Sequence, residues 1–557
     1  MNNRRIVIVG GVAGGASAAT RARRMNESAE IVLFEKDEHV SFANCGLPYH
    51  IGGEIEKRSK LLVATAEFLR KRFKIDVRVK HRVTSIDREN KRVMVEDLQT
   101  GTVHAVEYDK LILSPGARAA LPSIEGVRAK NVLTLRDLED MDRIKAIVDS
   151  GRAQHAVVVG SGFIGLEMIE QLVTRGLNTT LIERSSSVMP MLDSEMSDPI
   201  RAELERNGVA IRFKSTLEKL ELNQDGLAET AVLSDGNRIE ADLIIIGIGV
   251  QSNSELASDA GLELGESGAI ATNAYMQTRD PDIYAVGDAA EYTYGPTESP
   301  LRVAMAGPAN RSGRLAGQHA ATDHSDKMQP VQGTAIVRVF GLTAGVTGLT
   351  ARTAKKHGVS VRHATVVSKN HAGYYPNAQP MTLKLTYSPT SGQILGCQVV
   401  GGEGCDKRLD VVSTAMHFSG NVRQLGGLDL AYAPPFGAAK DPVHLAAFVA
   451  TNDLDGIESF CEAGADLSSR SVLDVRTASE VESNPLVGPT ERLVHIPVDE
   501  LRDRISELGE PDPKVVWVVT CAVGIRCHLA CRILTQKGHK VENLSGGVTV
   551  RKRAWRE

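Results

Sequence analysis

The sequence predicts an α/β protein with two Rossmann-like dinucleotide-binding domains, an α+β domain and a C-terminal α/β domain. Residues 5–36 and 156–184 each read as strand, glycine-rich turn, helix and strand, the order of a dinucleotide-binding βαβ unit. Residues 330–445 change to short strands with one long helix, and the strands SVLDVR and KVVWVVTC belong to a last unit beyond a boundary near residue 445. A chain of 557 residues is long enough for three or four domains.

Composition and charge exclude several classes of protein. The formal net charge of −4 gives no reason to expect nucleic acid or an anionic membrane as partner. The chain begins directly with a strand and has no apolar run long enough to cross a bilayer. Seven cysteines at irregular spacing favour reduced thiols over a disulfide framework. We therefore expect a cytoplasmic protein.

The first βαβ unit carries the glycines of a phosphate-binding turn. Gly10 permits the tight turn, Gly15 lets the helix pack closely on the strand, and Val12 replaces the usual second glycine. The helix N-terminus offers free N–H groups to a pyrophosphate. Glu35 ends the second strand, where a carboxylate can accept hydrogen bonds from a ribose.

The second unit has the full glycine pattern, with Gly160, Gly162 and Gly165, and Glu183 closes its second strand. A carboxylate at that place favours a free ribose 2′-hydroxyl and repels a 2′-phosphate. The unit therefore predicts NADH as the ligand, although the neighbouring Arg184 leaves NADPH possible.

Two further features follow apolar strands. The segment 282–291 places Asp288 just after a strand, where it could bond the sugar-like chain of a flavin or, alternatively, cap a helix. The stretch SFANCGLPYH (41–50) contains Cys45, and the next cysteine is Cys397. A nicotinamide donates hydride, and a flavin can pass the two electrons to sulfur, so two nucleotide folds beside one thiol make chemical sense.

At this point a family resemblance becomes specific. Residues 1 to about 445 resemble the flavoprotein disulfide reductases with two dinucleotide-binding domains, and SFANCGLPY, HAGYYP (371–376) and AYAPPFGAAKDP (431–442) resemble the coenzyme A disulfide reductases among them. The resemblance implies an FAD domain (1–150 and 251–328), an NAD(P)H domain (151–250) and a dimerisation domain (329–445). It implies FAD held by Gly10, Gly15, Glu35 and Asp288, and NAD(P)H held by Gly160, Gly162, Gly165 and Glu183. We also assign Lys36, Val83 and Gly249 to cofactor binding.

The resemblance implies that Cys45 cycles between a thiolate and a mixed disulfide with coenzyme A, so the second sulfur comes from the substrate. Such a thiol needs a lowered pKa; a buried, inert Cys45 is the alternative. Tyr374 and Tyr432 would reach the thiol from the other subunit of a homodimer, or else be packed core residues. Peroxidases and oxidases of the family typically carry a histidine in the first glycine-rich region, whereas the first histidine here is His39.

Coenzyme A carries phosphates and needs polar and cationic contacts. Arg21 and Arg24 on the first helix, with Ser41 and Asn44 beside the cysteine, are the candidates. A solvated basic helix face is the alternative for each arginine.

The last domain presents a second thiol, Cys521, at the end of an apolar strand. The loop from Cys521 to Arg526 can direct backbone N–H groups at the sulfur and stabilise a thiolate or persulfide. Cys-x-x-Gly-x-Arg after a strand resembles the rhodanese active-site loop, VLDVRTASEVE (472–482) and HIPVDEL (495–501) resemble flanking rhodanese segments, and SGGVTVRKRAW (545–555) matches loosely. We expect a rhodanese-like domain over 455–557.

Cys527 and Cys531 lie at i and i+4 on the helix after this loop. They could resolve a persulfide as a disulfide, but buried packing thiols are the better interpretation. His528 is expected to point off their face, so we expect no metal site.

Together these features suggest an NADH-dependent reductase of persulfides or polysulfides, of the coenzyme A disulfide reductase–rhodanese fusion type. One alternative is a plain coenzyme A disulfide reductase with an independent sulfurtransferase domain. Another is a non-reductive sulfurtransferase or redox sensor, against which Cys45, Glu183 and Asp288 argue.

Overall fold

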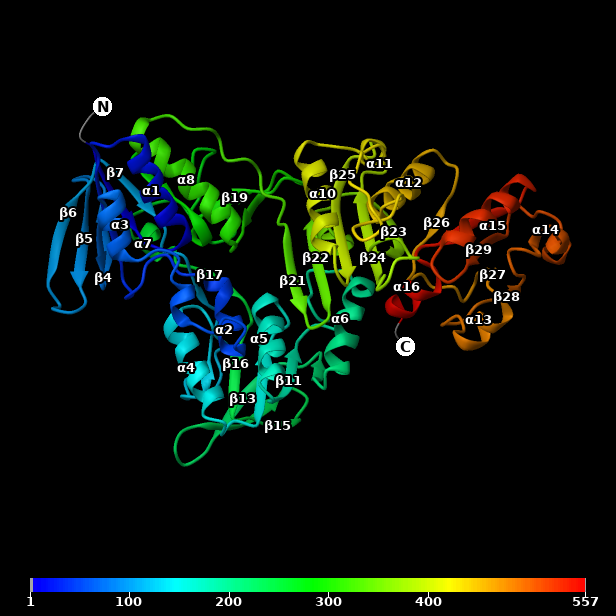
Figure 1. Ribbon diagram of the computed structural model, residues 1–557, viewed down its shortest axis with the longest axis horizontal. Coiled ribbons are helices and arrows are strands. Elements are labelled where there is room, and N and C mark those ends of the chain that lie inside the picture. The colour runs from blue at the N-terminus through cyan, green and yellow to red at the C-terminus, as the bar shows by residue number, and fades with distance from the viewer. Residues whose placement is uncertain (1–3, 556–557) are drawn as a thin grey trace. The chain divides into compact units, whose positions relative to one another are not determined.

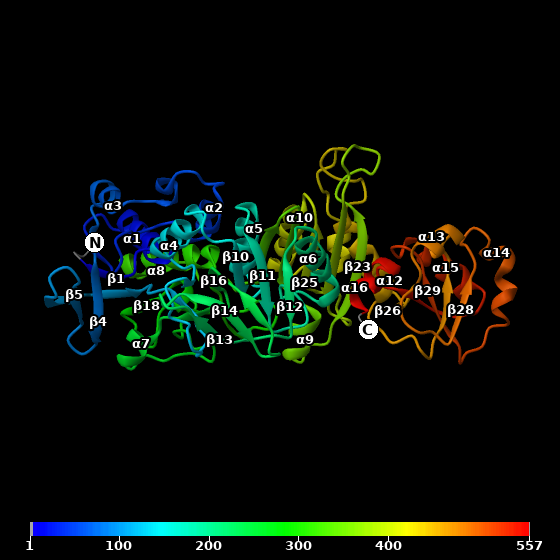
Figure 2. The ribbon, with the colours of Figure 1, turned by 90° about the horizontal axis from the view of Figure 1, so that it is seen from below.

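The computed structural model describes residues 4–555 (Figures 1 and 2). The chain forms two compact units. One comprises the chain up to Arg184 and Val209–Val331, and the other comprises Ser185–Gly208 and the chain from Gln332 onward. None of the described helices is long and apolar enough to span a membrane.

The first unit contains a five-stranded parallel sheet with the order β18-β7-β1-β2-β3. Its strands are β1 (Arg5–Val9), β2 (Glu30–Glu35), β3 (Asp76–Val79), β7 (Lys110–Leu113) and β18 (Ile283–Ala285). The four strands other than the edge strand β3 are apolar and largely buried on both faces, as is typical of parallel strands. Helix α1 (Ala13–Met25) packs so closely on α8 (Ala306–Thr322) that a side-chain carbon on Gly313 would lie 2.1 Å from the Gly14 carbonyl oxygen. Only glycine therefore fits at this crossing.

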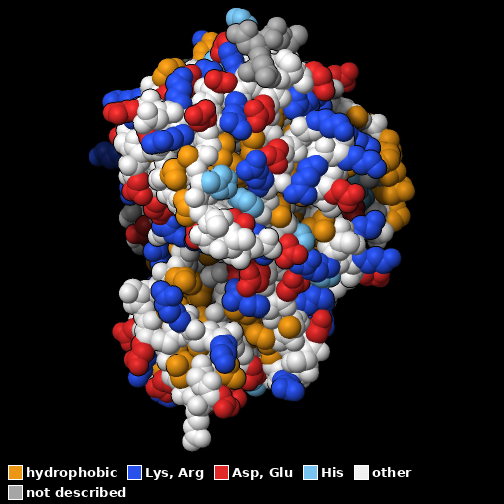
Figure 3. Space-filling model, turned by 90° about the vertical axis from the view of Figure 1, so that its left-hand side faces the viewer, with side chains coloured by type: hydrophobic (Ala, Val, Ile, Leu, Met, Phe, Trp, Pro, Cys, Tyr) orange, Lys and Arg blue, Asp and Glu red, His pale blue; other side chains and the backbone are white. Residues whose placement is uncertain are grey.

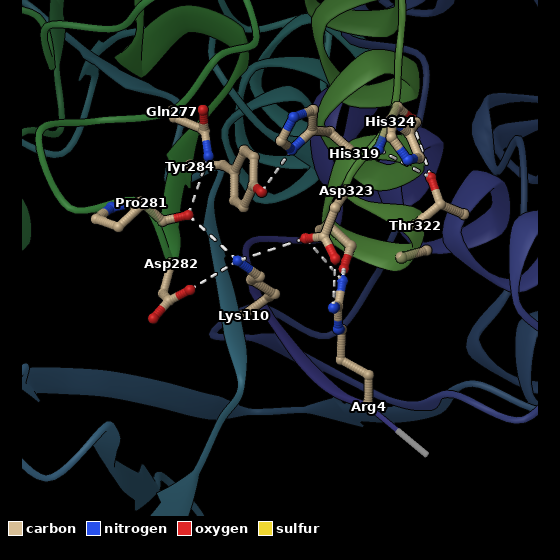
Figure 4. Close-up of polar contacts among 12 residues, drawn as sticks. Arg4, Lys110, Gln277, Pro281, Asp282, Tyr284, His319, Thr322, Asp323 and His324 are labelled. Carbon is tan, nitrogen blue, oxygen red and sulfur yellow. Dashed lines mark hydrogen bonds and ion pairs between the residues drawn. The ribbon is translucent and has the colours of Figure 1, made fainter. Parts of the chain in front are cut away.

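A polar cluster joins these elements at one end of the sheet (Figure 4). Lys110 Nζ on β7 lies 2.6 Å from Asp282 Oδ1, and Arg4 pairs with Asp323 at 2.7 Å. Tyr284 Oη on β18 lies 2.8 Å from His319 Nδ1 on α8. The cluster fixes α8 to the strands beneath it.

A second parallel sheet of the same unit has the order β12-β11-β10-β16-β9. Its strands are β9 (Val132–Leu133), β10 (His155–Val159), β11 (Asn178–Glu183), β12 (Ala210–Phe213) and β16 (Leu243–Ile246), and it is accompanied by α4 (Leu138–Asp149) and α5 (Phe163–Thr174). Strand β9 pairs with β16, so the chain enters this sheet at residue 132, ahead of the expected boundary at residue 150. So short a strand shows little periodicity in the sequence.

Smaller elements complete the first unit. Its antiparallel sheets are β4 (His81–Asp87), β5 (Arg92–Asp97) and β6 (Val103–Glu107); β13 (Leu217–Leu222), β14 (Ala228–Leu233) and β15 (Arg238–Glu240); β8 (Ala117–Ala119) with β17 (Val250–Ser252); and β19 (Glu291–Thr293) with β20 (Pro300–Arg302). Its short helices are α2 (Leu47–Gly52), α3 (Ala66–Phe73) and α7 (Glu255–Asp259). Basic and acidic side chains are interspersed over the described part of the face in Figure 3.

The second unit begins with an antiparallel sheet of order β21-β22-β25-β24-β23. Its strands are β21 (Ala335–Val339), β22 (Leu342–Gly348), β23 (Arg362–Lys369), β24 (Pro380–Tyr387) and β25 (Ile394–Gly401), and its helices are α9 (Ala351–Lys356), α10 (Cys405–His417), α11 (Val422–Gly426) and α12 (Pro442–Leu454). The expected boundary near residue 445 falls inside α12. Ala446, Ala447 and Ala450 of this helix pack in the apolar core of the sheet, so the helix belongs to it throughout.

Helix α6 (Ser194–Arg206) also packs in this unit, although its sequence lies within the expected NAD(P)H domain. The buried Lys384 on β24 holds the start of this segment, with Nζ 2.8 Å from Asp193 Oδ2 and 2.5 Å from Glu195 Oε1. Gln398 on β25 donates to Asp193 Oδ2 at 2.7 Å. This polar cluster ties residues 193–195 to the sheet.

The C-terminal part of the unit is a five-stranded parallel sheet of order β26-β30-β29-β27-β28. Its strands are β26 (Phe460–Cys461), β27 (Ser471–Asp474), β28 (Arg492–His495), β29 (Val516–Thr520) and β30 (Lys540–Leu544), and its helices are α13 (Ala478–Ser483), α14 (Leu501–Arg504), α15 (Ile525–Gln536) and α16 (Gly547–Ala554). Helix α16 packs on α6. Arg553 of α16 donates to Thr382 Oγ1 on β24 at 2.9 Å.

Candidate active site

The two glycine-rich turns have the same hydrogen-bond arrangement. The backbone N–H of Gly11 donates to Glu35 Oε2 at 2.7 Å. In the second turn, the N–H and hydroxyl of Ser161 donate to Glu183 Oε2 at 2.9 and 2.6 Å. Burial raises the pKa of Glu35. Both glutamates therefore stand at a strand end beside the turn, as the sequence indicated.

The glycines of the turns serve three purposes: backbone conformation, close packing and space for a ligand. Gly10 and Gly160 have φ of +91° and +97°, in the left-handed region that favours glycine. A side-chain carbon on Gly15 or Gly165 would lie 1.8 or 2.0 Å from the carbonyl oxygen of the first glycine of its turn. Gly162 has no protein atom within 4 Å of such a carbon. The open space beside the N-terminus of α5 fits the close approach of a dinucleotide pyrophosphate.

Three further cofactor assignments lie in different settings. Lys36 is exposed just beyond β2, Val83 is half-buried on β4, and Gly249 is exposed after β16 with φ of +114°. No contact among the described residues tests their roles, so they stay predictions.

Asp288 lies on a single 3-10 turn, Gly287–Ala289, rather than at the start of a helix. The alternative that it caps a helix is therefore wrong. Its Oδ2 pairs with Arg136 at 2.6 Å, and Asn44 donates to the Arg136 carbonyl oxygen at 3.2 Å. Arg136 thus joins the cysteine segment to Asp288, a role that the sequence did not indicate.

Cys45 lies on a 3-10 turn, Asn44–Gly46, directly before α2, and is exposed. Neighbouring atoms nevertheless crowd the sulfur, and desolvation, Glu167 and Asp288 raise its pKa, whereas Arg136 lowers it. The expectation of a lowered pKa is wrong for the groups that this chain itself supplies, because desolvation of the thiol, reinforced by the two carboxylates, outweighs the single guanidinium. The alternative of a buried, inert thiol is also wrong.

The residues proposed for coenzyme A do not share one environment. Ser41 has φ of +48° and donates its N–H to the Gly11 carbonyl oxygen at 2.9 Å, next to the first glycine-rich turn. Arg21 donates to Gln318 on α8 at 3.1 Å, and the exposed Arg24 stacks on Phe73. Both arginines have partners within the fold, and their role in coenzyme A binding stays a prediction.

Tyr374 and Tyr432 come together although 58 residues separate them, with their hydroxyl oxygens 3.2 Å apart. Their exposed fractions are 78% and 49%, so neither is a packed core residue. Phe436, four residues after Tyr432, is 71% exposed. Large exposed aromatic side chains of this kind are typical of a surface that a partner covers.

Cys521 follows β29 and is buried. The thiol of Cys527 and the backbone N–H groups of the loop donate hydrogen bonds to its sulfur and lower its pKa to about 6; the donor at Gly524 N is 3.1 Å away. The predicted nest of N–H groups is thus present. The thiol of Cys527, which the sequence interpretation treated as packing, is an additional donor.

The Cys521 loop is held from two sides. Arg526 makes paired hydrogen bonds to Glu480 at 2.6 and 2.7 Å. Val548 N–H in α16 donates to the Cys521 carbonyl oxygen at 2.9 Å, and Gly547 approaches so closely that a side-chain carbon there would lie 2.4 Å from that oxygen. The segment that matched only loosely in sequence therefore braces the loop. Among residues 4–555 no cluster of three or more His, Cys, Asp or Glu side chains could hold a metal ion.

Comparison with known proteins adds the following findings. Residues 4–313 match the family model described as pyridine nucleotide-disulphide oxidoreductase, and residues 334–442 match the dimerisation domain of that family. The coenzyme A disulfide reductase of Staphylococcus aureus (strain JH9) is 35% identical over 446 residues, which cover 80% of this chain and 99% of that protein.

Two solved structures are similar over nearly the whole chain. The crystal structure of reduced Bacillus anthracis CoADR-RHD is 41% identical, with a TM-score of 0.94, and covers 100% of this chain and 98% of its own. The NAD-dependent persulfide reductase from A. fulgidus is 36% identical, with a TM-score of 0.90, and the match covers 98% and 99% of the two chains. With its paired glycine-rich turns and a cysteine beside the first of them, this chain belongs to the pyridine nucleotide-disulphide oxidoreductase family.

Proposed function

We propose that this enzyme uses NADH and FAD to reduce the S–S bond of coenzyme A persulfide, and that its C-terminal domain delivers sulfane sulfur from persulfide or polysulfide donors. The observation that carries the proposal is that the surroundings of Cys521 favour its thiolate. Its sulfur receives hydrogen bonds from a thiol and from backbone N–H groups, which lower its pKa to about 6. A purely structural cysteine needs no such donors. The full-length similarity to a persulfide reductase supports the same conclusion.

The residues present fit both cofactors. The turn at Gly10 with Glu35 and Asp288 would hold FAD, and the turn at Gly160 with Glu183 would hold NADH. When bound, FAD would supply two-electron transfer from NADH to sulfur. The chain's own contribution is to place the glutamates where a ribose can bind and to leave the surface at Gly162 open to the pyrophosphate.

Cys45 performs the reductive step. Its thiolate attacks the coenzyme A-linked sulfur of the persulfide, forms a mixed disulfide with coenzyme A, and releases hydrosulfide. Two electrons from NADH then cleave the mixed disulfide into the Cys45 and coenzyme A thiolates, and a proton is released. Arg136 favours the Cys45 thiolate, and the proposed partner residues Tyr374 and Tyr432 contribute hydroxyl groups across a homodimer interface.

Cys521 performs the transfer step. Its thiolate attacks the sulfane sulfur of a persulfide or polysulfide, and the donor leaves as a thiolate that is one sulfur shorter. The coenzyme A thiolate then takes the outer sulfur from the Cys521 persulfide, which forms coenzyme A persulfide and restores the Cys521 thiolate.

The test is anaerobic NADH consumption with coenzyme A persulfide, polysulfide or coenzyme A disulfide, in wild type, Cys45→Ser and Cys521→Ser. We expect coenzyme A persulfide to be preferred, hydrosulfide to appear, and Cys45→Ser to be inactive with every substrate. Cys521→Ser should lose turnover on polysulfide with coenzyme A and keep turnover on coenzyme A persulfide.

The second candidate is a coenzyme A disulfide reductase with an independent sulfurtransferase domain. It is favoured by the curated S. aureus relative, whose match covers 80% of this chain. Preference for coenzyme A disulfide together with an unaltered Cys521→Ser variant would establish this candidate and refute the first.

A further inference from the structure

One cysteine lies on the sulfur-accepting loop and two lie on the helix that follows it, and the proposed function uses only the first. Cys521 follows β29, whereas Cys527 and Cys531 lie one turn apart on α15. The exposed fractions of the three are 1%, 0% and 1%, and all three belong to one apolar core. The two helix thiols are therefore matched in chemistry and burial, and they differ in what they face.

Cys527 faces Cys521. Its thiol donates a hydrogen bond to the Cys521 sulfur, which also receives the Gly524 N–H at 3.1 Å. Cys531 hydrogen-bonds the carboxylate of Glu458, and besides burial and this carboxylate the charge of Cys521 also helps to raise the pKa of Cys531. That carboxylate is held by His528 Nδ1 at 2.6 Å and by Asn543 Nδ2 at 2.8 Å.

We propose that Cys527 is a positioning residue, whose neutral thiol hydrogen-bonds the Cys521 sulfur and thereby stabilises the Cys521 thiolate before sulfur capture and after sulfur release. This inference rests on the proposed sulfur-accepting role of Cys521. It assigns a function to a thiol that would otherwise serve only as packing.

Burial decides between a donor and a nucleophile at Cys527. Desolvation, together with the neighbouring Cys521 sulfur, raises the pKa of Cys527 well above its ordinary value. The thiol therefore keeps its proton at neutral pH and cannot readily attack a persulfide as a thiolate. It can donate a hydrogen bond, and a donor beside an anion in a buried site is effective because no water competes.

The position of the negative charge during transfer determines which step benefits. When Cys521 carries a persulfide, the charge lies mainly on the outer sulfur, which is farther from Cys527. When coenzyme A takes that sulfur, the charge returns to Cys521 as the S–S bond breaks. A donor at Cys527 therefore stabilises the departing thiolate and accelerates discharge, because a thiol of lower pKa leaves faster.

The experiment measures the pH dependence of Cys521 alkylation by iodoacetamide in the full-length, FAD-loaded chain. Cys45→Ser serves as the background, so that the exposed thiol of Cys45 is absent, and the labelled peptide is identified by mass spectrometry. Cys527→Val removes the donor at similar volume, Cys527→Ser keeps a donor, and Cys531→Val is the matched packing control.

We expect Cys527→Val to raise the alkylation midpoint by about one pH unit, the effect of losing one hydrogen bond to a buried anion. Cys527→Ser should stay close to the parent, and Cys531→Val should not shift the midpoint. With Cys45 restored, Cys527→Val given polysulfide should accumulate the Cys521 persulfide, seen as the mass of one added sulfur.

Equal midpoints in Cys527→Val and the parent would overturn the inference. Equal shifts in Cys527→Val and Cys531→Val would also overturn it, because packing would then explain both. If the valine variants do not fold, Cys527→Ser remains decisive. This variant keeps a donor, so an alkylation midpoint raised by about one pH unit above the parent would contradict the role. Alkylation does not depend on NADH turnover, so failure of the proposed reductase function would be seen separately.

Discussion

Replacing Gly162 by alanine separates the demands of the fold from those of the nucleotide. Gly162 precedes α5 with φ of −72° and ψ of −176°, an extended conformation that alanine adopts without strain. No protein atom lies within 4 Å of the added carbon. The free energy of unfolding should therefore be unchanged or rise by about 0.4–1 kcal/mol, because alanine restricts the unfolded chain.

The same carbon would project into the space where the NADH pyrophosphate is proposed to lie. We expect the apparent KM for NADH to rise about tenfold, equivalent to ~1.4 kcal/mol of lost binding. Gly165→Ala is the contrasting variant, because its carbon would lie 2.0 Å from the Gly160 carbonyl oxygen and should lower both stability and NADH affinity. The assays are initial rates against NADH concentration, flavin absorbance to verify FAD content, and thermal unfolding. A wild-type KM in a stable Gly162→Ala variant would refute the proposed position of the pyrophosphate.

Three other predictions concern the second unit. The pKa of Cys521 is lowered to about 6, so its thiolate is present above that pH and lost below it. Sulfur capture from polysulfide in single-turnover experiments should therefore fall about tenfold from pH 7 to pH 5, and a midpoint near 9 would contradict the assignment. Lys384→Met leaves Asp193 and Glu195 buried without their cation and should reduce stability to chemical denaturation by about 3–5 kcal/mol; an unchanged unfolding midpoint would show that the cluster is not needed. Gly547→Ala should displace the Cys521 loop, abolishing sulfur transfer while NADH reduction of coenzyme A persulfide continues; equal loss of both activities would mean that the variant is misfolded.

The sequence predicted those parts of the site that lie on one local segment. Glu35 and Glu183 end strands next to glycine-rich turns, and Cys521 lies between a strand and a helix, so that periodicity and turn residues were enough to place them. Arg136 was missed because 152 residues separate it from Asp288, and no local pattern indicates such a contact. The raised pKa of Cys45 likewise depends on the desolvation and the two nearby carboxylates that only the fold brings about.

Domain boundaries were the other weakness of sequence reasoning. Strand β9 has only two residues, and α12 runs through the expected boundary, with its one proline, Pro442, at the start of the helix rather than at its end. In both places the element is assigned by its packing partner, β16 or the β23–β24 face, rather than by its own composition. Packing of this kind becomes visible only in three dimensions.

The contacts of α16 bear on how the two proposed catalytic functions can be separated in the laboratory. Arg553 is half-buried, donates to Thr382 and lies near Asp198, so the last helix completes a surface formed by β24 and α6. Expressing the two parts separately would remove α16 from the surface of the flavoprotein part. It would also leave the C-terminal part with the Arg553 guanidinium unpaired and with apolar groups exposed. Point substitutions at Cys45 and Cys521 are therefore the sound way to silence one chemistry at a time, whereas activities of isolated fragments would mix lost catalysis with lost solubility.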